Sequence, residues 1–120
     1  MEEGFNDFFR RKTKVFAIAL IKYINKLPRN EITRVINYQL LKAGTSVGAN
    51  FRAACRARSD AENYSKLCIV VEEADETLFW LEIIEESEID NSPDLHYLKK
   101  EALEIVSIAA KARKNHSHHK

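Results

Sequence analysis

The chain has 120 residues and a mass of 13.9 kDa, enough for one domain with a hydrophobic core but too few for a nucleotide-binding sheet plus a second domain. Hydrophobic residues make up 45% of the chain and charged residues 31%, a balance typical of a globular protein. Three Gly and two Pro are too few for the many turns of a β-sandwich or barrel. The composition therefore predicts an all-α fold with few, long helices.

The formal net charge of +1 conceals an uneven distribution along the chain. Residues 1–66 carry 13 basic and 6 acidic residues, whereas residues 67–120 carry 6 basic and 12 acidic ones. This division predicts either a polyanionic partner for the basic half or pairing between the halves, within or between subunits.

The first predicted helix covers residues 6–27 and ends before Pro28, which pushes the preceding residue out of the helical conformation. Apolar side chains recur at steps of three and four, as in the core-facing stripe of an amphipathic helix. This stripe consists of Phe8, Phe9, Val15, Phe16, Ala19, Leu20, Tyr23 and Leu27.

The second predicted helix covers residues 30–58, with Asn30 as its N-cap. Gly44 and Gly48 lie inside it at a cost of about 1 kcal/mol each relative to Ala, but the apolar phase continues through both. We therefore expect one helix in which glycine permits a close helix–helix approach or a bend; a loop at residues 44–48 is the alternative. The predicted stripe consists of Ile32, Val35, Ile36, Gln39, Leu40, Ala43, Val47, Asn50, Phe51 and Ala54.

The third predicted helix covers residues 60–86 and opens with Ser59 and Glu62 at the spacing of a capping box. Its main stripe consists of Tyr64, Leu67, Cys68, Val71, Ala74, Leu78 and Leu81. Further apolar residues, among them Phe79, Trp80, Ile83 and Ile84, surround the rest of the helix. One bundle cannot cover that much apolar circumference, so we expect copies to assemble.

The fourth predicted helix covers residues 94–114 and follows an acidic connector, residues 85–94. Its stripe consists of Leu95, Leu98, Ala102, Ile105, Ala109 and Ala112. Residues 115–120 are expected to form a flexible tail. Four long helices with short connections predict a single domain, an antiparallel up-and-down four-helix bundle.

The sequence carries no recognisable catalytic, metal or cofactor motif. A di-metal site in a helical bundle needs Glu-x-x-His on two helices, but the only interior histidine, His96, has Pro93 three residues before it. Cys55 and Cys68 lie outside any zinc spacing and are expected to be buried thiols. Pairing either cysteine with His96 is a disfavoured route to an enzyme, so we predict a non-enzymatic protein without metal or cofactor.

The first residues lack the basic-then-apolar order of a signal peptide. No apolar run approaches the roughly 20 residues that a membrane span needs. We therefore expect a cytoplasmic protein without a membrane partner.

Basic side chains gather at two places, one in the first helix and one at the end of the second. Guanidinium and ammonium groups at helical spacing suit the recognition of phosphate. The candidate nucleic-acid contacts are Arg10, Arg11, Lys12, Lys14, Arg52, Arg56 and Arg58. The alternative is that these residues are solvated or pair with acidic residues of the third helix.

Residues 39–50, with the sequence QLLKAGTSVGAN, resemble the second-helix signature of the proteins encoded in 23S rRNA intervening sequences, the S23 ribosomal protein family. Ser59, Tyr64, the pairs at 66–67 and 73–74, and ETLFWL at residues 76–81 extend the resemblance over about residues 8–112. It implies an antiparallel four-helix bundle that assembles as a ring-shaped homopentamer. In a relative, the accessory protein of diversity-generating retroelements, a basic pentamer binds nucleic acid and a reverse transcriptase.

Asn50 on the core stripe would cost about 1–3 kcal/mol if it were buried without a partner. We expect it to hydrogen-bond a neighbouring helix, with Ser46 or Glu76 as partner; simple packing at a bend is the alternative. The candidate structural or interface residues are Ser46, Asn50, Glu76, Phe79, Trp80, Ile83 and Ile84.

The leading hypothesis is a homo-oligomer whose basic residues neutralise the phosphates of RNA or DNA. In an oligomer each basic patch repeats around an axis and meets a long polyanion many times. The alternative is a scaffold or adaptor oligomer that binds another protein without nucleic acid.

Overall fold

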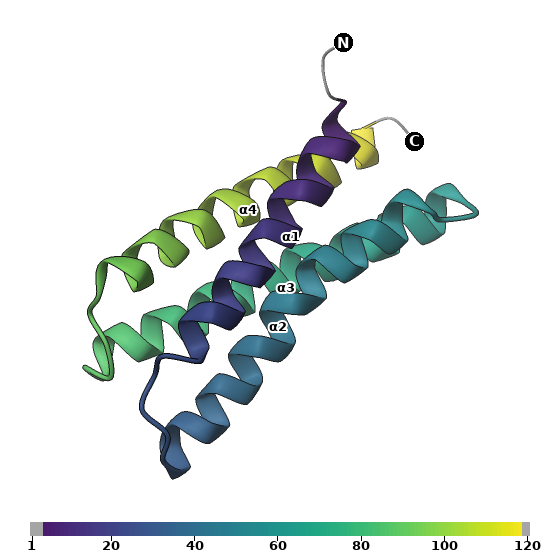
Figure 1. Ribbon diagram of the computed structural model, residues 1–120. Coiled ribbons are helices and arrows are strands. Elements are labelled where there is room, and N and C mark those ends of the chain that lie inside the picture. Colours follow the sequence, from purple (N-terminus) through teal and green to yellow (C-terminus); the bar gives the residue numbers. More distant parts are fainter. Residues whose placement is uncertain (1–3, 119–120) are drawn as a thin grey trace.

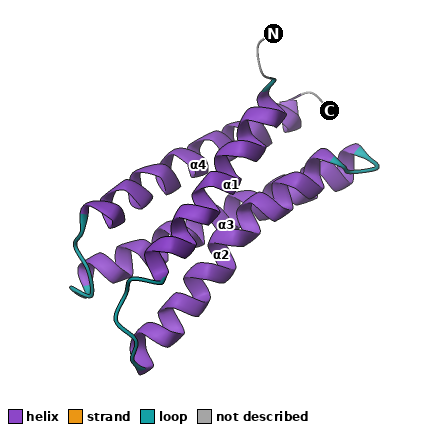
Figure 2. Cartoon of the chain, in the orientation of Figure 1, coloured by secondary structure: helices purple, strands orange, loops and turns teal. Residues whose placement is uncertain are grey.

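The structure is a computed structural model that describes residues 4–118 and, within them, the side chains up to residue 116. It contains four helices: α1 (Phe5–Ile24), α2 (Glu31–Cys55), α3 (Asp60–Glu86) and α4 (Pro93–His118). Within the described residues there is no strand, so the chain is all-α (Figure 2). Each helix packs antiparallel against the next and α4 returns to α1, as in an up-and-down bundle (Figure 1). The predicted fold class is confirmed.

The helix starts follow the predicted capping residues. Asn30 Oδ1 accepts hydrogen bonds from the backbone N–H groups of Ile32 and Thr33, both at 3.0 Å, and Thr33 Oγ1 accepts the Asn30 N–H in return. At α3, Ser59 Oγ accepts the Glu62 N–H at 3.1 Å, but the Glu62 carboxylate accepts the N–H of Arg58 instead of that of Ser59. The second capping box is therefore only half formed.

Three helix ends differ from the predicted positions. α1 ends at Ile24, although Leu27 is still buried, and α2 ends at Cys55. α4 continues to His118, so residues 115–118 are helical where the sequence analysis placed a flexible tail. Positions 119 and 120 lie outside the described residues.

The core runs along the bundle axis and draws on all four helices. The predicted stripe of α4 is buried from Leu95 to Ala109. The stripe predicted for α3 is confirmed at Leu67, Ala74 and Leu81, but it missed Val70, Thr77 and Ile84, because apolar residues surround this helix and its periodicity does not single out one side. The buried residues of α3 are Leu67, Val70, Ala74, Thr77, Leu81 and Ile84.

The outer surfaces of α1 and α2 hold apolar residues that the sequence analysis placed in the core. Phe8, Val15, Ile32 and Val35 are between 37% and 67% exposed. They follow the helical spacing of the core stripes but lie beyond the edge that α3 and α4 cover. The apolar stripe of each helix is therefore wider than its buried face.

The two glycines of α2 lie where α1 crosses it. A Cβ atom at Gly44 would overlap Leu20 Cδ2 of α1 and would lie 3.7 Å from Thr77 Cγ2 of α3. A Cβ atom at Gly48 would lie 3.1 Å from Thr13 Oγ1. α2 is one continuous helix through both glycines, as predicted, and the close approach is their structural reason.

Replacing Gly44 with alanine should destabilise the protein by about 1 kcal/mol, because overpacking by about 1–3 kcal/mol outweighs a gain of about 1 kcal/mol in helix propensity. In a Leu20→Ala background the overlap disappears, so Gly44→Ala should become stabilising. Urea unfolding of the four proteins in this double-mutant cycle measures both effects. If Gly44→Ala stabilises the protein even with Leu20 present, the two helices are not in tight contact.

Candidate nucleic-acid interface

A basic groove of about 690 Å³ lies between α1 and α2. Five of its ten lining residues are cationic and none is acidic. The cations, which we call the groove cations, are Arg10, Arg11, Lys14, Arg52 and Arg56.

Helical spacing and antiparallel packing bring the groove cations together. Arg10 and Lys14 are four residues apart on α1, and Arg52 is in the last turn of α2 with Arg56 as its C-cap four residues on, so each pair lies along one edge of its helix. The N-terminal half of α1 runs beside the C-terminal half of α2, so these two edges border the same groove (Figure 1).

Small residues form the floor between the two basic edges. Ala17 of α1 and Thr45, Gly48 and Ala49 of α2 line the groove there. The sequence analysis identified both basic clusters but did not place them in one groove or assign this floor. The glycine at position 48 indicates a close approach of helices, but the sequence does not show which helix lies against it.

Two groove cations have partners of their own. The Arg10 guanidinium forms an ion pair with Asp7, one turn earlier in α1. Its side chain is nevertheless 39% exposed, so it remains accessible from the groove. Arg11 also has an interaction partner within the described chain.

Lys12 and Arg58 do not line the groove. Lys12 extends toward α4, where its Nζ lies 2.9 Å from Glu101 Oε2 and 2.8 Å from Glu104 Oε1. Burial lowers the Lys12 pKa, but hydrogen bonds to Glu104 and Glu101 outweigh it, and the pKa is raised above the ordinary 10.5. Arg58 is exposed in the connection between α2 and α3.

The opposite charges of the two halves of the chain partly neutralise each other inside the subunit. Lys12 pairs with α4, and Lys26 Nζ lies 3.3 Å from Asp94 Oδ2. In contrast, the basic groove has no acidic lining residue from either half. It is therefore a distinct positive surface.

The residues predicted for assembly have unequal exposure. Ile84 is fully buried in its own subunit and has no surface to offer a second copy. Trp80 and Ile83 are partly buried against the core, and the Trp80 Nε1–H donates to Glu76 Oε2 at 3.3 Å. Phe79 is 49% exposed, so it is the residue of this group that presents a large apolar surface.

Asn50 does not bond to a neighbouring helix. Its Nδ2 donates to the backbone carbonyl of Ser46 at 2.8 Å, within α2, and Ser46 Oγ donates to the Lys42 carbonyl. Ser46 is one of the two expected partners, but the expectation of a cross-helix bond was wrong, because this partly exposed asparagine satisfies its amide one turn back along its own helix.

Beyond the basic groove, the outer surface of α1 and α2 becomes apolar. We call this region the apolar outer face; it consists of Ile18 and Ile21 of α1 and Tyr38 and Leu41 of α2, each at least 37% exposed. An exposed apolar patch of this kind marks an interaction surface.

The arrangement of cysteine and histidine gives no support to catalysis. His96 Nδ1 lies 3.4 Å from Glu85 Oε2, near the start of α4, whereas the cavity that Cys55 lines meets α4 between Ile108 and His116. Even the nearer end of this stretch is about 18 Å along the helix from His96. Burial also raises the pKa of the Cys55 thiol, so it is less nucleophilic at neutral pH.

The described residues contain neither a cluster of metal ligands nor a membrane-spanning helix. No group of three or more His, Cys, Asp or Glu side chains in residues 4–118 has an arrangement that could hold a metal ion. No helix in the part of the chain that the structure describes has the length and apolar character of a membrane span.

The chain is similar to one protein family and to solved protein structures. Residues 9–111 match the family described as 23S rRNA-intervening sequence protein. The crystal structure of a protein of unknown function from the S23 ribosomal protein family of Bacteroides thetaiotaomicron VPI-5482 superposes with a TM-score of 0.83 at 29% identity, covering 91% of this chain and 97% of that one. No curated protein matches the chain.

Replacing Lys12 with glutamine should lower the free energy of unfolding by about 1 kcal/mol at pH 7, because Glu101 and Glu104 lose a charged hydrogen-bond donor. Since the Lys12 pKa is raised by folding, its contribution is complete below about pH 10.5 and is lost as the pH rises through the raised value. Urea unfolding of both proteins from pH 7 to 11 checks this. A variant as stable as the parent at pH 7 would contradict it.

Proposed function

The chain belongs to the 23S rRNA-intervening sequence protein family, and from this premise we propose that it is a non-enzymatic homo-oligomer that binds RNA or DNA through the basic groove. The observation that carries the proposal is the convergence of five cations from two helices on one groove without an acidic lining residue. The expected mechanism is neutralisation of phosphates without readout of bases.

The form of the groove supports a polyanion as the partner. Its small floor residues leave room for a sugar–phosphate backbone to approach between the two edges. Arg52 and Arg56 supply guanidinium groups, which bind phosphate oxygens in a planar, bidentate geometry. Lys14 adds an ammonium group on the opposite edge.

Assembly would multiply this binding surface. We propose that copies meet through the apolar outer face, which adjoins the basic groove and leaves its cations accessible. A pentamer is the assembly that the family resemblance implies. Each ring would present five grooves to one nucleic acid, so weak contacts would add up to tight binding.

A scaffold function without nucleic acid has one observation in its favour. The outer side of α3 carries exposed Phe79 together with carboxylates at helical spacing around it, namely Glu72, Asp75, Glu76, Glu82 and Glu86. This acidic surface of one copy is complementary in charge to the basic groove of another. If the two surfaces meet in the oligomer, the groove is an assembly site and is closed to nucleic acid.

Replacing Arg52 and Arg56 together with glutamine should weaken RNA and DNA binding and reduce the salt dependence. With all five cations engaged, the slope of log affinity against log salt is about −4.5 for duplex DNA, and the double variant should bring it nearer to zero by about 2. Binding titrations with an RNA hairpin and a DNA duplex at several salt concentrations measure both slopes.

The matched control is Lys100→Gln with Lys114→Gln, which removes the same charge from exposed positions of α4. Equal losses in the two double variants would mean that only net charge matters and would overturn the groove assignment. If Arg52→Gln with Arg56→Gln instead lowers the mass of the oligomer, the scaffold function is correct.

Light scattering should give a mass of about five times 13.9 kDa for the parent protein, as the proposed pentamer requires. Tyr38→Glu, at a 62% exposed position of the apolar outer face, should reduce this mass while the helical circular dichroism is retained. Tyr97→Glu, at a 49% exposed position of α4, is the control and should leave the mass unchanged. A parent protein that is monomeric at micromolar concentration contradicts assembly.

A further inference from the structure

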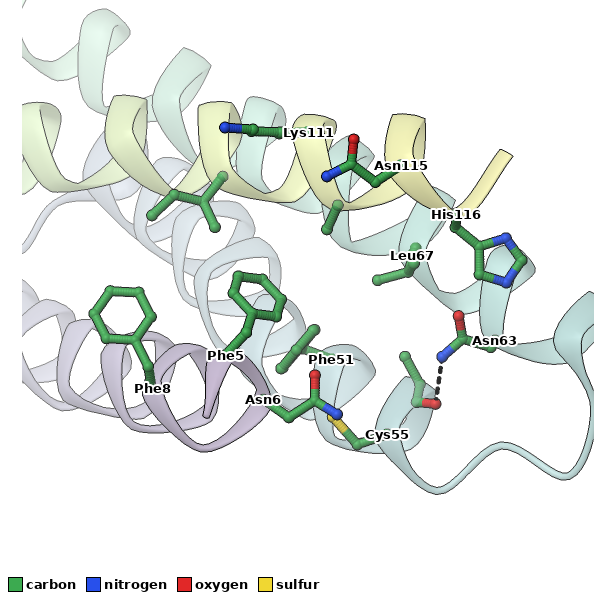
Figure 3. Close-up of a pocket in the computed structure, with 13 residues that line it drawn as sticks. Phe5, Asn6, Phe8, Phe51, Cys55, Asn63, Leu67, Lys111, Asn115 and His116 are labelled. Atoms are coloured by element: carbon green, nitrogen blue, oxygen red, sulfur yellow. Dashed lines mark hydrogen bonds between the residues drawn. The ribbon is translucent and has the colours of Figure 1, made fainter. Parts of the chain in front are cut away.

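A second cavity, of about 540 Å³, lies at the end of the bundle where α1 begins and α4 ends (Figure 3). Its volume is within the range of about 300–1,000 Å³ found for small-molecule pockets. All four helices line it, and it shares no lining residue with the basic groove. We call it the end cavity.

The walls of the end cavity are largely apolar. Phe5 and Phe8 of α1 line it and are 46% and 37% exposed, so much of their surface is available to a ligand. Phe5 packs edge-on against Phe51 at a centroid distance of 6.0 Å, and Phe51 is itself held by Phe9 at 4.7 Å. These contacts give the cavity a preorganised aromatic wall.

Polar groups gather on the side that α4 provides. Lys111 and Asn115 lie one turn apart on this helix, followed by His116, and α1 with its phenylalanines lies across the cavity (Figure 3). His116 is stacked on Tyr64 at 5.3 Å, and its Nδ1 is buried without a hydrogen-bond partner among the described residues. Among the described residues that line the cavity none is acidic, and Lys111 carries a positive charge.

We propose that the end cavity binds a single-chain amphiphile with an anionic head, the chain lying against Phe5, Phe8 and Phe51 and the head beside Lys111 and Asn115. A purely apolar ligand would make no use of the exposed Lys111 ammonium group, and a small anion would leave the aromatic wall in water. An anionic amphiphile satisfies both sides of the cavity. The inference is independent of the proposed function, because the two use different residues.

The rates at which the two free cysteines are alkylated show whether a ligand occupies the end cavity. Cys55 lines the end cavity, whereas Cys68 does not, and both are partly accessible. The native full chain is alkylated with a maleimide in the presence of dodecanoate, dodecanol or acetate, below micellar concentrations, and each cysteine is followed by mass spectrometry. Protection follows mass action, so dodecanoate at ten times its dissociation constant should slow the alkylation of Cys55 about tenfold and leave Cys68 unchanged.

The substitution Lys111→Gln tests whether Lys111 recognises the anionic head group of the ligand. The variant should lose up to about fivefold in dodecanoate affinity, measured by calorimetric titration, and should bind dodecanol as the parent does. Acetate should protect neither cysteine. The proposal is overturned if dodecanoate does not protect Cys55, if dodecanol protects it equally well in the parent, or if Cys55 protection rises with protein concentration without ligand, which would identify a second copy as the occupant.

Discussion

The close packing of α1 against α2 at Gly44 is the constraint on which the rest of the structure depends. A Cβ atom at Gly44 would overlap Leu20 Cδ2 of α1 and would be in ordinary contact with Thr77 of α3, so three helices meet at this position. Leu20 and Thr77 are both buried, so the contact at Gly44 joins α1 and α2 to the core of the bundle. One turn later, Gly48 continues the approach against Thr13. These contacts at Gly44 and Gly48 set the separation between the two basic edges of the groove.

The same packing directs the basic side chains of α1 to different neighbours. Lys12 and Lys14 are two residues apart, which on a helix turns their side chains about 200° away from each other. Lys12 is directed to α4 and joins the two halves of the chain through Glu101 and Glu104. Lys14 is directed to the groove that faces solvent. A single basic cluster in the sequence thus has a structural part and a part that is available to a partner.

The sequence predicted the four helices, their order and the α4 core because those features depend on local spacing and capping. It was incomplete at α3, where apolar residues on every side hide Val70 and Ile84 among the buried residues, and it failed at Val15, Ile32 and Val35, which carry the core periodicity but lie on the outside. It also failed to distinguish Lys12, which pairs with acidic residues of α4, from Lys14, which lines the basic groove. Which helix lies beside which edge is a tertiary property, and a helical repeat contains no information about it. The candidate residues Arg10, Arg11, Lys14, Arg52 and Arg56 could be named from the sequence, but their meeting in one groove could not.

The central claim is that two edges 40 residues apart in the chain form one surface for a polyanion. The most direct measurement is photochemical cross-linking of the native protein to a thiouridine-containing RNA, followed by peptide mapping. Our account predicts cross-links on both sides of the groove, within residues 10–17 of α1 and 45–56 of α2. Cross-links confined to α3 or α4, or to one side of the groove alone, would contradict it.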